Sequence, residues 1–205
     1  MNITLTQLSK RFNRDWIFKR IDYHFSSGNS YAITGPNGSG KSTLLQAIAG
    51  SLHISEGKVE YHLNDSAIAP EHFYRYVSIA APYLELIEEM TAKEFLHFHQ
   101  QFKPLTSPAD IDSILAEVGL ENSTNKQIRY FSSGMKQRLK LAQAVFSDTP
   151  VLLLDEPCTN LDKAGYDLYH SLIEKYCMNK LVIISSNDPQ EMDFCTNRIS
   201  ILDHK

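Results

Sequence analysis

Residues 35–42 carry the pattern Gly-x-x-x-x-Gly-Lys-Ser, whose spacing suits the binding of phosphate groups. Glycines let the main chain approach an anion and turn its N–H groups toward it, and the start of a following helix adds a positive dipole end. Lys41 is expected to reach the β- and γ-phosphates of a nucleotide, and Ser42 to hold Mg²⁺ through its hydroxyl. The predicted nucleotide-binding residues here are Gly35, Pro36, Asn37, Gly38, Ser39, Gly40, Lys41, Ser42 and Thr43.

Two acidic residues follow a second apolar run. Residues 151–154 read Val-Leu-Leu-Leu, which is typical of a buried strand, and Asp155 and Glu156 come directly after it. Open α/β sheets place their ligands at the carboxyl ends of their strands. Asp155 is therefore predicted to hold the Mg²⁺ water shell beside Ser42, and Glu156 to orient or deprotonate an attacking water. A plain polar turn is the alternative, which the upstream phosphate loop makes weak.

The elements that must position these residues divide into three parts. Up to about residue 80, apolar residues alternate with polar ones as in strands, notably in 21–25, 59–63 and 75–80, and 31–34 leads into the phosphate loop. The loop is followed by a helix-like run, 43–49, that Gly50 closes. This strand–loop–helix context argues against an ordinary glycine-rich turn with a surface lysine.

Helical patterns occupy residues 81–147, and α/β patterns return after them. Thr91 with Glu94 three residues later forms a capping box, and a second helix begins near Asp110 and stops at Gly119. Further elements are predicted as a helix from about 134 to 146, a helix over roughly 164–177, a strand at 181–184, a helix that starts at Asp188, and a strand at 199–202.

Composition and charge exclude several classes. The net charge of −4 gives no reason to expect nucleic acid as the main partner. No apolar stretch approaches the roughly 20 residues that span a bilayer, and the N-terminus shows no secretory signal. The three cysteines, Cys158, Cys177 and Cys195, are far apart and odd in number, which favours reduced thiols in the cytosol. His97 and His99 are two residues apart on a predicted helix, so a metal site there is disfavoured.

A third motif is Phe-Ser-Ser-Gly-Met-Lys-Gln-Arg at 131–138. Here the chain resembles the ATP-binding cassette (ABC) ATPases, whose signature reads Leu-Ser-Gly-Gly-Gln before Lys/Arg-Gln-Arg. The resemblance covers nearly the whole chain, and the motifs come in the family's order. Small residues at a helix start again expose N–H groups to an anion, although a purely structural N-cap is the alternative. The matching segment is Ser132, Ser133, Gly134 and Met135, with Ser133 and Met135 departing from the family pattern.

The resemblance implies the fold and the assembly. It implies one ABC ATPase domain over residues 1–205, an α/β P-loop NTPase with a mixed sheet core, an antiparallel β lobe and an inserted helical subdomain at about 81–147. The core would comprise 1–80 and 148–205. The signature segment would meet the γ-phosphate of ATP held by a second subunit, in a head-to-tail dimer. Asp162 resembles the D-loop aspartate at the subunit boundary. Phe12 falls where the family stacks an aromatic ring on adenine, with Trp16 or a role of Phe12 in the core as alternatives.

Two departures from the family bear on the rate of hydrolysis. The family glutamine that binds Mg²⁺ is missing between Val77 and Lys93, and Asn187 stands where the family has a histidine that steadies the γ-phosphate and the attacking water. Asparagine donates a hydrogen bond but carries no positive charge. Loss of one stabilising donor typically costs about 10²–10³ in rate. Because Glu156 is present, we expect slow hydrolysis.

The resemblance therefore implies an ATP-binding subunit of an ABC transporter, using ATP and Mg²⁺. Its partners would be a second ATPase subunit, identical or different, and a separately encoded integral membrane permease. Such a subunit lies in the cytoplasm, bound peripherally at the inner face of the cell membrane. Two other hypotheses are a soluble ABC-type ATPase acting on nucleic acid or ribosomes, and a regulatory subunit that binds ATP with weak turnover. A kinase or small GTPase is disfavoured by the signature helix and by the absence of an Asn-Lys-x-Asp run.

Overall fold

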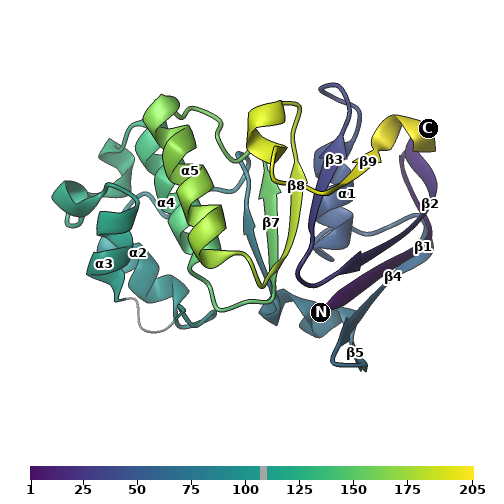
Figure 1. Ribbon diagram of the computed structural model, residues 1–205, viewed down its shortest axis with the longest axis horizontal. Helices are drawn as coiled ribbons and strands as arrows, with labels where there is room; N and C mark the ends of the chain where they lie inside the picture. Colours follow the sequence, from purple (N-terminus) through teal and green to yellow (C-terminus); the bar gives the residue numbers. More distant parts are fainter. Residues whose placement is uncertain (107–109) are drawn as a thin grey trace.

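The computed structural model describes residues 1–106 and 110–205 and places the strands in two sheets (Figure 1). The five-stranded sheet has the order β6-β7-β8-β3-β9, and all its strand pairs are parallel. The four-stranded sheet, β2-β1-β4-β5, is antiparallel. The strands of the parallel sheet are β3 (Ser30–Thr34), β6 (Val77–Ala80), β7 (Val151–Asp155), β8 (Leu181–Ser185) and β9 (Asn197–Ser200). The antiparallel strands are β1 (Asn2–Phe12), β2 (Asp15–Ser26), β4 (Glu56–Leu63) and β5 (Ser66–Ile68).

The central strands are apolar throughout because both faces of the parallel sheet are covered. Helix α1 (Lys41–Ile48) packs between this sheet and the antiparallel one, where its Leu44 and Leu45 meet Leu153 of β7. The opposite face, with Leu152 and Leu154, packs against the other helices. These are α2 (Ala92–His99), α3 (Ile111–Glu117), α4 (Ser133–Val145) and α5 (Lys163–Tyr176). In Figure 1, α2, α3 and α4 lie at one end of the molecule and the antiparallel sheet at the other.

Side-chain caps fix the starts of these helices. The capping box of Thr91 and Glu94 is confirmed, and Asp110 caps α3 by accepting from the N–H of Ser113 at 2.7 Å. Ser132 caps α4 and Asp162 caps α5 in the same way. Such caps satisfy N–H groups that have no partner inside the helix. The expected α/β fold with an antiparallel lobe and inserted helices is confirmed, with parallel and antiparallel pairs divided between the two sheets.

Several predicted boundaries are wrong. Arg75 belongs to a 3₁₀ helix, η1 (Pro70–Arg75), and the strand begins only at Val77. The final strand lies two residues earlier than predicted, at 197–200, because Ile201 opens a 3₁₀ turn, η5 (Ile201–His204), and packs into the core. Asp188 does cap a helix, but that helix is the single 3₁₀ turn η4 (Pro189–Met192). Two further 3₁₀ turns are η2 (Glu121–Ser123) and η3 (Ile128–Tyr130).

Candidate nucleotide-binding site

Three segments predicted to carry chemistry meet at one edge of the parallel sheet. Asp155 pairs with Ser185 in the register of β7 and β8, and Ile33 of β3 pairs with Ser185 on the other side. The phosphate loop, residues 35–40, follows β3, and Asn187 follows β8. We call the edge where these strands end the carboxyl edge. It is the edge at which open α/β sheets bind their ligands.

The phosphate loop and Glu156 together line a cleft of about 240 Å³. Gly40 has a φ of 103°, and a Cβ there would lie 2.2 Å from the Cγ2 of Ile17, so only glycine fits. Helix α1 begins at Lys41 and directs its positive dipole end at the cleft. The cleft is lined by Ile17, Asn37, Gly38, Gly40, Lys41, Ser42, Thr43 and Glu156.

Lys41 is only 5% exposed, and its ammonium lies over its own loop. The Nζ donates to the carbonyl oxygens of Gly35 at 2.9 Å and Pro36 at 3.4 Å. Carbonyl oxygens are neutral acceptors, and bonds from an ammonium to charged oxygens are stronger. The side chain is thus placed to exchange these carbonyls for phosphate oxygens.

Among residues 1–106 and 110–205, the buried side-chain oxygens without a hydrogen-bond partner are Ser39 Oγ, Asp155 Oδ1 and Ser185 Oγ. All lie at the carboxyl edge. A buried polar atom left without a partner costs about 1–3 kcal/mol, so such a cluster points to groups that the protein itself does not supply. A carboxylate and hydroxyls are oxygen ligands of the kind that Mg²⁺ prefers, so these residues fit a bound Mg²⁺.

Burial is the main influence on Asp155. It raises the pKa of that carboxyl, while the nearby hydroxyls of Ser42 and Ser185 and the ammonium of Lys41 act in the opposite direction. A cation beside the carboxylate would favour its charged form and reverse the effect of burial. The electrostatics of Asp155 therefore agree with a cation site at the end of β7.

Glu156 has a left-handed backbone conformation, with a φ of 43°. Non-glycine residues adopt this region infrequently, and such conformations concentrate at functional sites. The N–H of Glu156 donates to the carbonyl of Ser185 at 2.8 Å, which ties the residue to the end of β8. This geometry turns the chain sharply after the strand and places Glu156 in the wall of the cleft.

Asn187 also reaches the phosphate loop. Its Nδ2 donates to the side-chain oxygen of Asn37, across 150 positions of sequence. Asn187 therefore contacts the phosphate loop through Asn37, which lines the same cleft as Lys41, Ser42 and Glu156. Its amide contributes a dipole where a histidine could contribute a charge.

The signature segment forms a second cleft, of about 390 Å³, which shares no lining residue with the first. Ser132 Oγ accepts from the N–H of Met135 at 3.2 Å, and Asp162 Oδ1 lies 3.7 Å from Nη2 of Arg138. A Cβ on Gly134 would approach the carbonyl oxygen of Asn160 to 3.1 Å. The segment 132–135 and Asp162 thus share one surface, but within one chain this surface is separate from the phosphate loop.

Phe12 stands at the end of β1 with 47% of its surface exposed, and the Nζ of Lys10 lies 4.5 Å from its ring centre. It does not line the cleft of the phosphate loop, whereas Ile17 of β2 does. Trp16 is half-buried, with cationic groups of Arg11 and Lys19 near its ring. Sequence reasoning missed Ile17 because one apolar residue in a strand has no distinguishing pattern.

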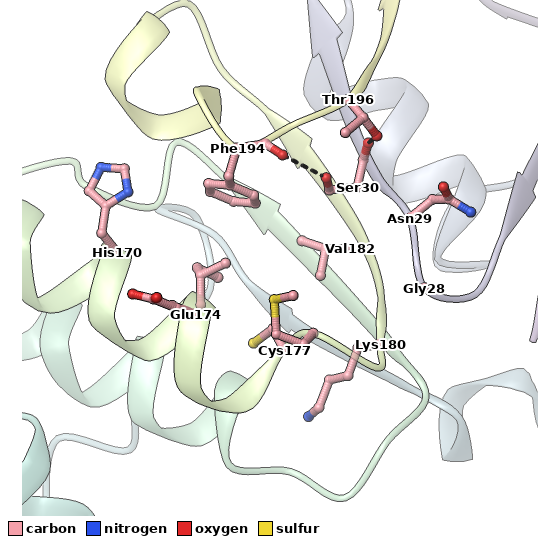
Figure 2. Close-up of a pocket in the computed structure, with 12 residues that line it drawn as sticks. Gly28, Asn29, Ser30, His170, Glu174, Cys177, Lys180, Val182, Phe194 and Thr196 are labelled. Atoms are coloured by element: carbon pink, nitrogen blue, oxygen red, sulfur yellow. Dashed lines mark hydrogen bonds between the residues drawn. The ribbon is translucent and has the colours of Figure 1, made fainter.

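A larger and more apolar pocket, of about 450 Å³, lies beneath α5 at the starts of β3 and β8 (Figure 2). Two of its polar side chains are engaged within the protein: Ser30 Oγ donates to the carbonyl of Phe194 at 3.0 Å, and Lys180 Nζ donates to the carbonyls of Val145 and Ser147. Cys177 is a buried free thiol here, and burial raises its pKa to about 11. Nothing in this lining resembles a phosphate site.

The sequence pattern described as "ABC transporter" matches residues 18–159, more than half of the chain. The chain belongs to this family. ABC ATP-binding domains hydrolyse ATP and typically use Mg²⁺. In the part of the chain that the structure describes, every helix is too short or too polar to cross a membrane.

Individual relatives agree with this assignment. The chain is 31% identical over 191 residues to an uncharacterized ABC transporter ATP-binding protein, YybJ, of Bacillus subtilis, covering 93% of this chain and 87% of the relative. It is 31% identical over 195 residues to the cytochrome c biogenesis ATP-binding export protein CcmA of Agrobacterium fabrum, covering 92% and 90%. Among solved structures, a putative ABC transporter ATP-binding protein from Pyrococcus furiosus shares the fold over all of both chains, with a TM-score of 0.83 and 20% identity.

In this ABC chain, the turn after β6 contains no glutamine. The N–H of Leu84 donates to the carbonyl of Ala81 at 3.2 Å, and the Nζ of Lys140 donates to the carbonyls of Ala81 and Pro82 at 3.2 and 2.9 Å. Burial raises the pKa of Tyr83, the Gln46 side chain lowers it, and the charge of Asp155 raises it. An aromatic hydroxyl therefore lies near Asp155, a feature without a motif in the sequence.

Proposed function

We propose that this chain powers an ABC transporter by binding and hydrolysing ATP at the carboxyl edge of its parallel sheet. The cluster of buried, unpartnered oxygens around Lys41 carries the proposal, because a triphosphate with its cation supplies the partners that Ser39, Asp155 and Ser185 lack. The loop 35–43 would bind the phosphates, and Phe12 the adenine ring.

The residues present would hold Mg²⁺ between Ser42 and Asp155. Bound there, the cation neutralises charge on the β- and γ-phosphates. Glu156 accepts a proton from the attacking water as the general base. Asn187, already in contact with Asn37, donates a hydrogen bond toward the reacting phosphate.

Two subunits are needed to complete this site. The signature cleft around Ser132–Met135 and the phosphate-loop cleft are separate in one chain, so each ATP would be covered by the signature cleft of a second subunit. The partner can be an identical copy or a related chain. Asp162, which closes the signature cleft, would lie at the boundary between the two subunits.

Hydrolysis is expected to be slow. The missing glutamine removes one ligand near the cation, and Asn187 cannot carry the charge of a histidine. These same departures favour a second candidate function, a regulatory subunit that binds ATP with little turnover. The two functions differ in phosphate release and agree in ATP binding.

The partner that receives the motion would be an integral membrane permease, with this chain bound peripherally at the inner face of the membrane. We place its contact at a groove of about 770 Å³ between residues 82–89 and helix α4. Glu85, Glu88 and Glu89 line the groove together with Lys136 and Lys140, and Ile87 is exposed within it. Glu88 pairs with Lys136, and Glu89 pairs with Arg129. A short amphipathic helix that carries both apolar and charged residues matches this lining. The groove lies in the segment 81–147 that we assign to the helical subdomain, inside a single domain whose core is 1–80 and 148–205.

Glu156→Gln tests the proposed function directly. The amide removes the base without changing size, so the variant is expected to bind ATP and accumulate as a dimer under saturating ATP and Mg²⁺. The measurement is molar mass by light scattering after gel filtration, with phosphate release assayed on the wild type. Glu156→Gln combined with Lys41→Ala is the control, and it should stay monomeric.

A monomeric Glu156→Gln protein under saturating ATP would count against the two-subunit site. ATP binding by the wild type with no phosphate release would support the regulatory function. Absence of ATP binding by folded wild type would reject both.

A further inference from the structure

The buried carboxylate of Glu191 has no role in the proposed chemistry, yet it contacts the loop that follows Glu156. Glu191 belongs to η4, four positions after Asn187, and is only 3% exposed. Its Oε1 accepts a hydrogen bond of 2.7 Å from the N–H of Cys158, two residues after Glu156. Buried glutamates are rare unless they are paired or hydrogen-bonded, so this contact requires an explanation.

Helix α5 fixes the main chain that carries this carboxylate. The hydroxyl of Tyr169 donates to the carbonyl of Glu191 at 2.7 Å, and that of Tyr166 donates to Oδ2 of Asp188 at 2.7 Å. Asp188 in turn accepts from the N–H of Gln190 at 2.9 Å. Glu191 is therefore anchored at its main chain while its side chain reaches back to Cys158.

A second side chain, from another element, also binds the loop after Glu156. Gln137 of α4 is buried, and its Nε2 donates to the carbonyl of Pro157 at 2.6 Å. Successive residues of the loop, Pro157 and Cys158, are thus bound by side chains from two different elements. Because Glu156 and Asn160 both have left-handed backbones, the loop depends on such outside contacts to keep its shape.

We propose that Glu191 is a positioning residue for hydrolysis: its carboxylate holds the loop 156–162 against the segment that carries Asn187. Glu156 and Asn187 then keep fixed positions relative to each other. Asp162, at the end of the same loop, is held in position with them. Glu191 touches neither nucleotide nor water in this role and acts through the main chain of Cys158. The proposal rests on the proposed function for its effect on rate, but its structural part is independent.

The groups around Glu191 fit a carboxylate that accepts hydrogen bonds. Burial raises its pKa most, the Ser186 hydroxyl and the Cys158 N–H lower it, and the charges of Asp188 and Glu156 raise it. The charge of Glu191, after burial itself, also raises the pKa of the Cys158 thiol. The Cys158 thiol is therefore kept uncharged, and both it and the main-chain N–H of Cys158 interact with the carboxylate of Glu191.

Comparing Glu191→Ala with Glu191→Gln tests the hydrogen-bond acceptor, because alanine removes it whereas glutamine keeps an oxygen that can accept and a side chain of similar size. In Glu191→Ala the buried N–H of Cys158 loses its acceptor, so kcat should fall about 10–100-fold while the Kd for ATP stays within about twofold. Hydrogen exchange in the peptide 155–162 should become faster. In Glu191→Gln the carboxamide oxygen can still accept, so both kcat and exchange should return close to wild type. Glu174→Ala, an exposed glutamate of α5, is the matched control and should change neither.

Unchanged kcat and unchanged exchange in folded Glu191→Ala would overturn the proposal. So would a loss of ATP affinity as large as the loss of kcat, or a Glu191→Gln protein as impaired as Glu191→Ala. Should Glu191→Ala fail to fold, Tyr169→Phe removes the anchor alone. It should lower kcat about threefold and speed exchange at 155–162, and no change in either would overturn the proposal. If the wild type hydrolyses no ATP, the proposed function fails, while the exchange result still decides the role of Glu191.

Discussion

The two edges of the parallel sheet are built from the same apolar strands and differ in how their polar groups are satisfied. At the carboxyl edge, Ser39, Asp155 and Ser185 each keep a buried oxygen without a partner. At the opposite, amino edge, Lys103 donates to the carbonyl of Val77 at 2.7 Å and Lys180 to that of Ser147 at 2.7 Å. Both edges bury ammonium groups that donate to main-chain carbonyls, but among the described residues the buried side-chain oxygens without a partner lie at the carboxyl edge.

This difference indicates which edge is built for a ligand. Burial lowers the pKa of Lys103 and Lys180, and in each case the ammonium is compensated by main-chain carbonyls. At the carboxyl edge the strained backbone of Glu156 accompanies the missing partners. The pocket of Figure 2 lies at the amino edge and is larger than the phosphate-loop cleft, so a larger volume does not mark the ligand edge.

Lys41→Ala gives the largest expected effect at the carboxyl edge. Loss of the ammonium removes a charged donor to the phosphates, and ATP turnover should fall at least about 10²–10³-fold. The measurement is phosphate release at saturating ATP, together with nucleotide affinity. Unaltered affinity and rate would refute the assignment of Lys41.

Lys180→Ala is the matched change at the amino edge. It removes an ammonium that bonds the carbonyls of Val145 and Ser147, so the free energy of unfolding should fall by about 1–3 kcal/mol. ATP affinity and turnover per folded molecule should stay as in the wild type. Urea unfolding measures the first and a binding assay the second. A selective loss of ATP affinity would erase the distinction between the edges.

Lowering the pH should reduce the free energy of unfolding through His99, which lies near the amino edge. Its ring bonds Ser147 at 2.8 Å, and burial, with a contribution from Lys103, lowers its pKa to about 4. The unfolded chain binds this proton near pH 6.5 and the folded chain only near pH 4, so stability is lost as pH falls between these values. From pH 7 to pH 5 the loss should be about 2 kcal/mol. In His99→Gln the free energy of unfolding should depend less on pH, and an equal dependence would exclude His99 as its source.

Asn187→His tests the smallest effect, at the carboxyl edge. An imidazole beside Asn37 adds a donor that can carry charge, and ATP turnover should rise about tenfold. Steady-state kcat measures it, with Gln190→His, an exposed position on η4, as the control. Turnover that stays at the wild-type rate would show that this position does not limit hydrolysis.

The sequence was sufficient for features that depend on local pattern. The apolar runs that became β7 and β8, the capping box at Thr91 and the phosphate loop are all set by neighbouring residues. The strand that was expected to include Ile201 ends before it, because a buried contact beside the phosphate loop outweighs strand propensity.

Contacts between segments that are far apart in the chain could not be predicted from the sequence. Ile17 at the cleft and Glu191 behind Cys158 carry no motif, and each reaches its place only when distant segments fold together. The same holds for the bond between Asn187 and Asn37. Residue types and spacing predict the groups that we propose for the chemistry, while tertiary packing decides which groups hold them.

The most direct test of the account is a crystal structure with Mg²⁺ and a non-hydrolysable ATP analogue. The account predicts a triphosphate over residues 35–42, with Lys41 Nζ moved from the Gly35 carbonyl to phosphate oxygens and a cation between Ser42 and Asp155. An intact protein that shows no analogue over this loop at saturating concentration would contradict the central claim.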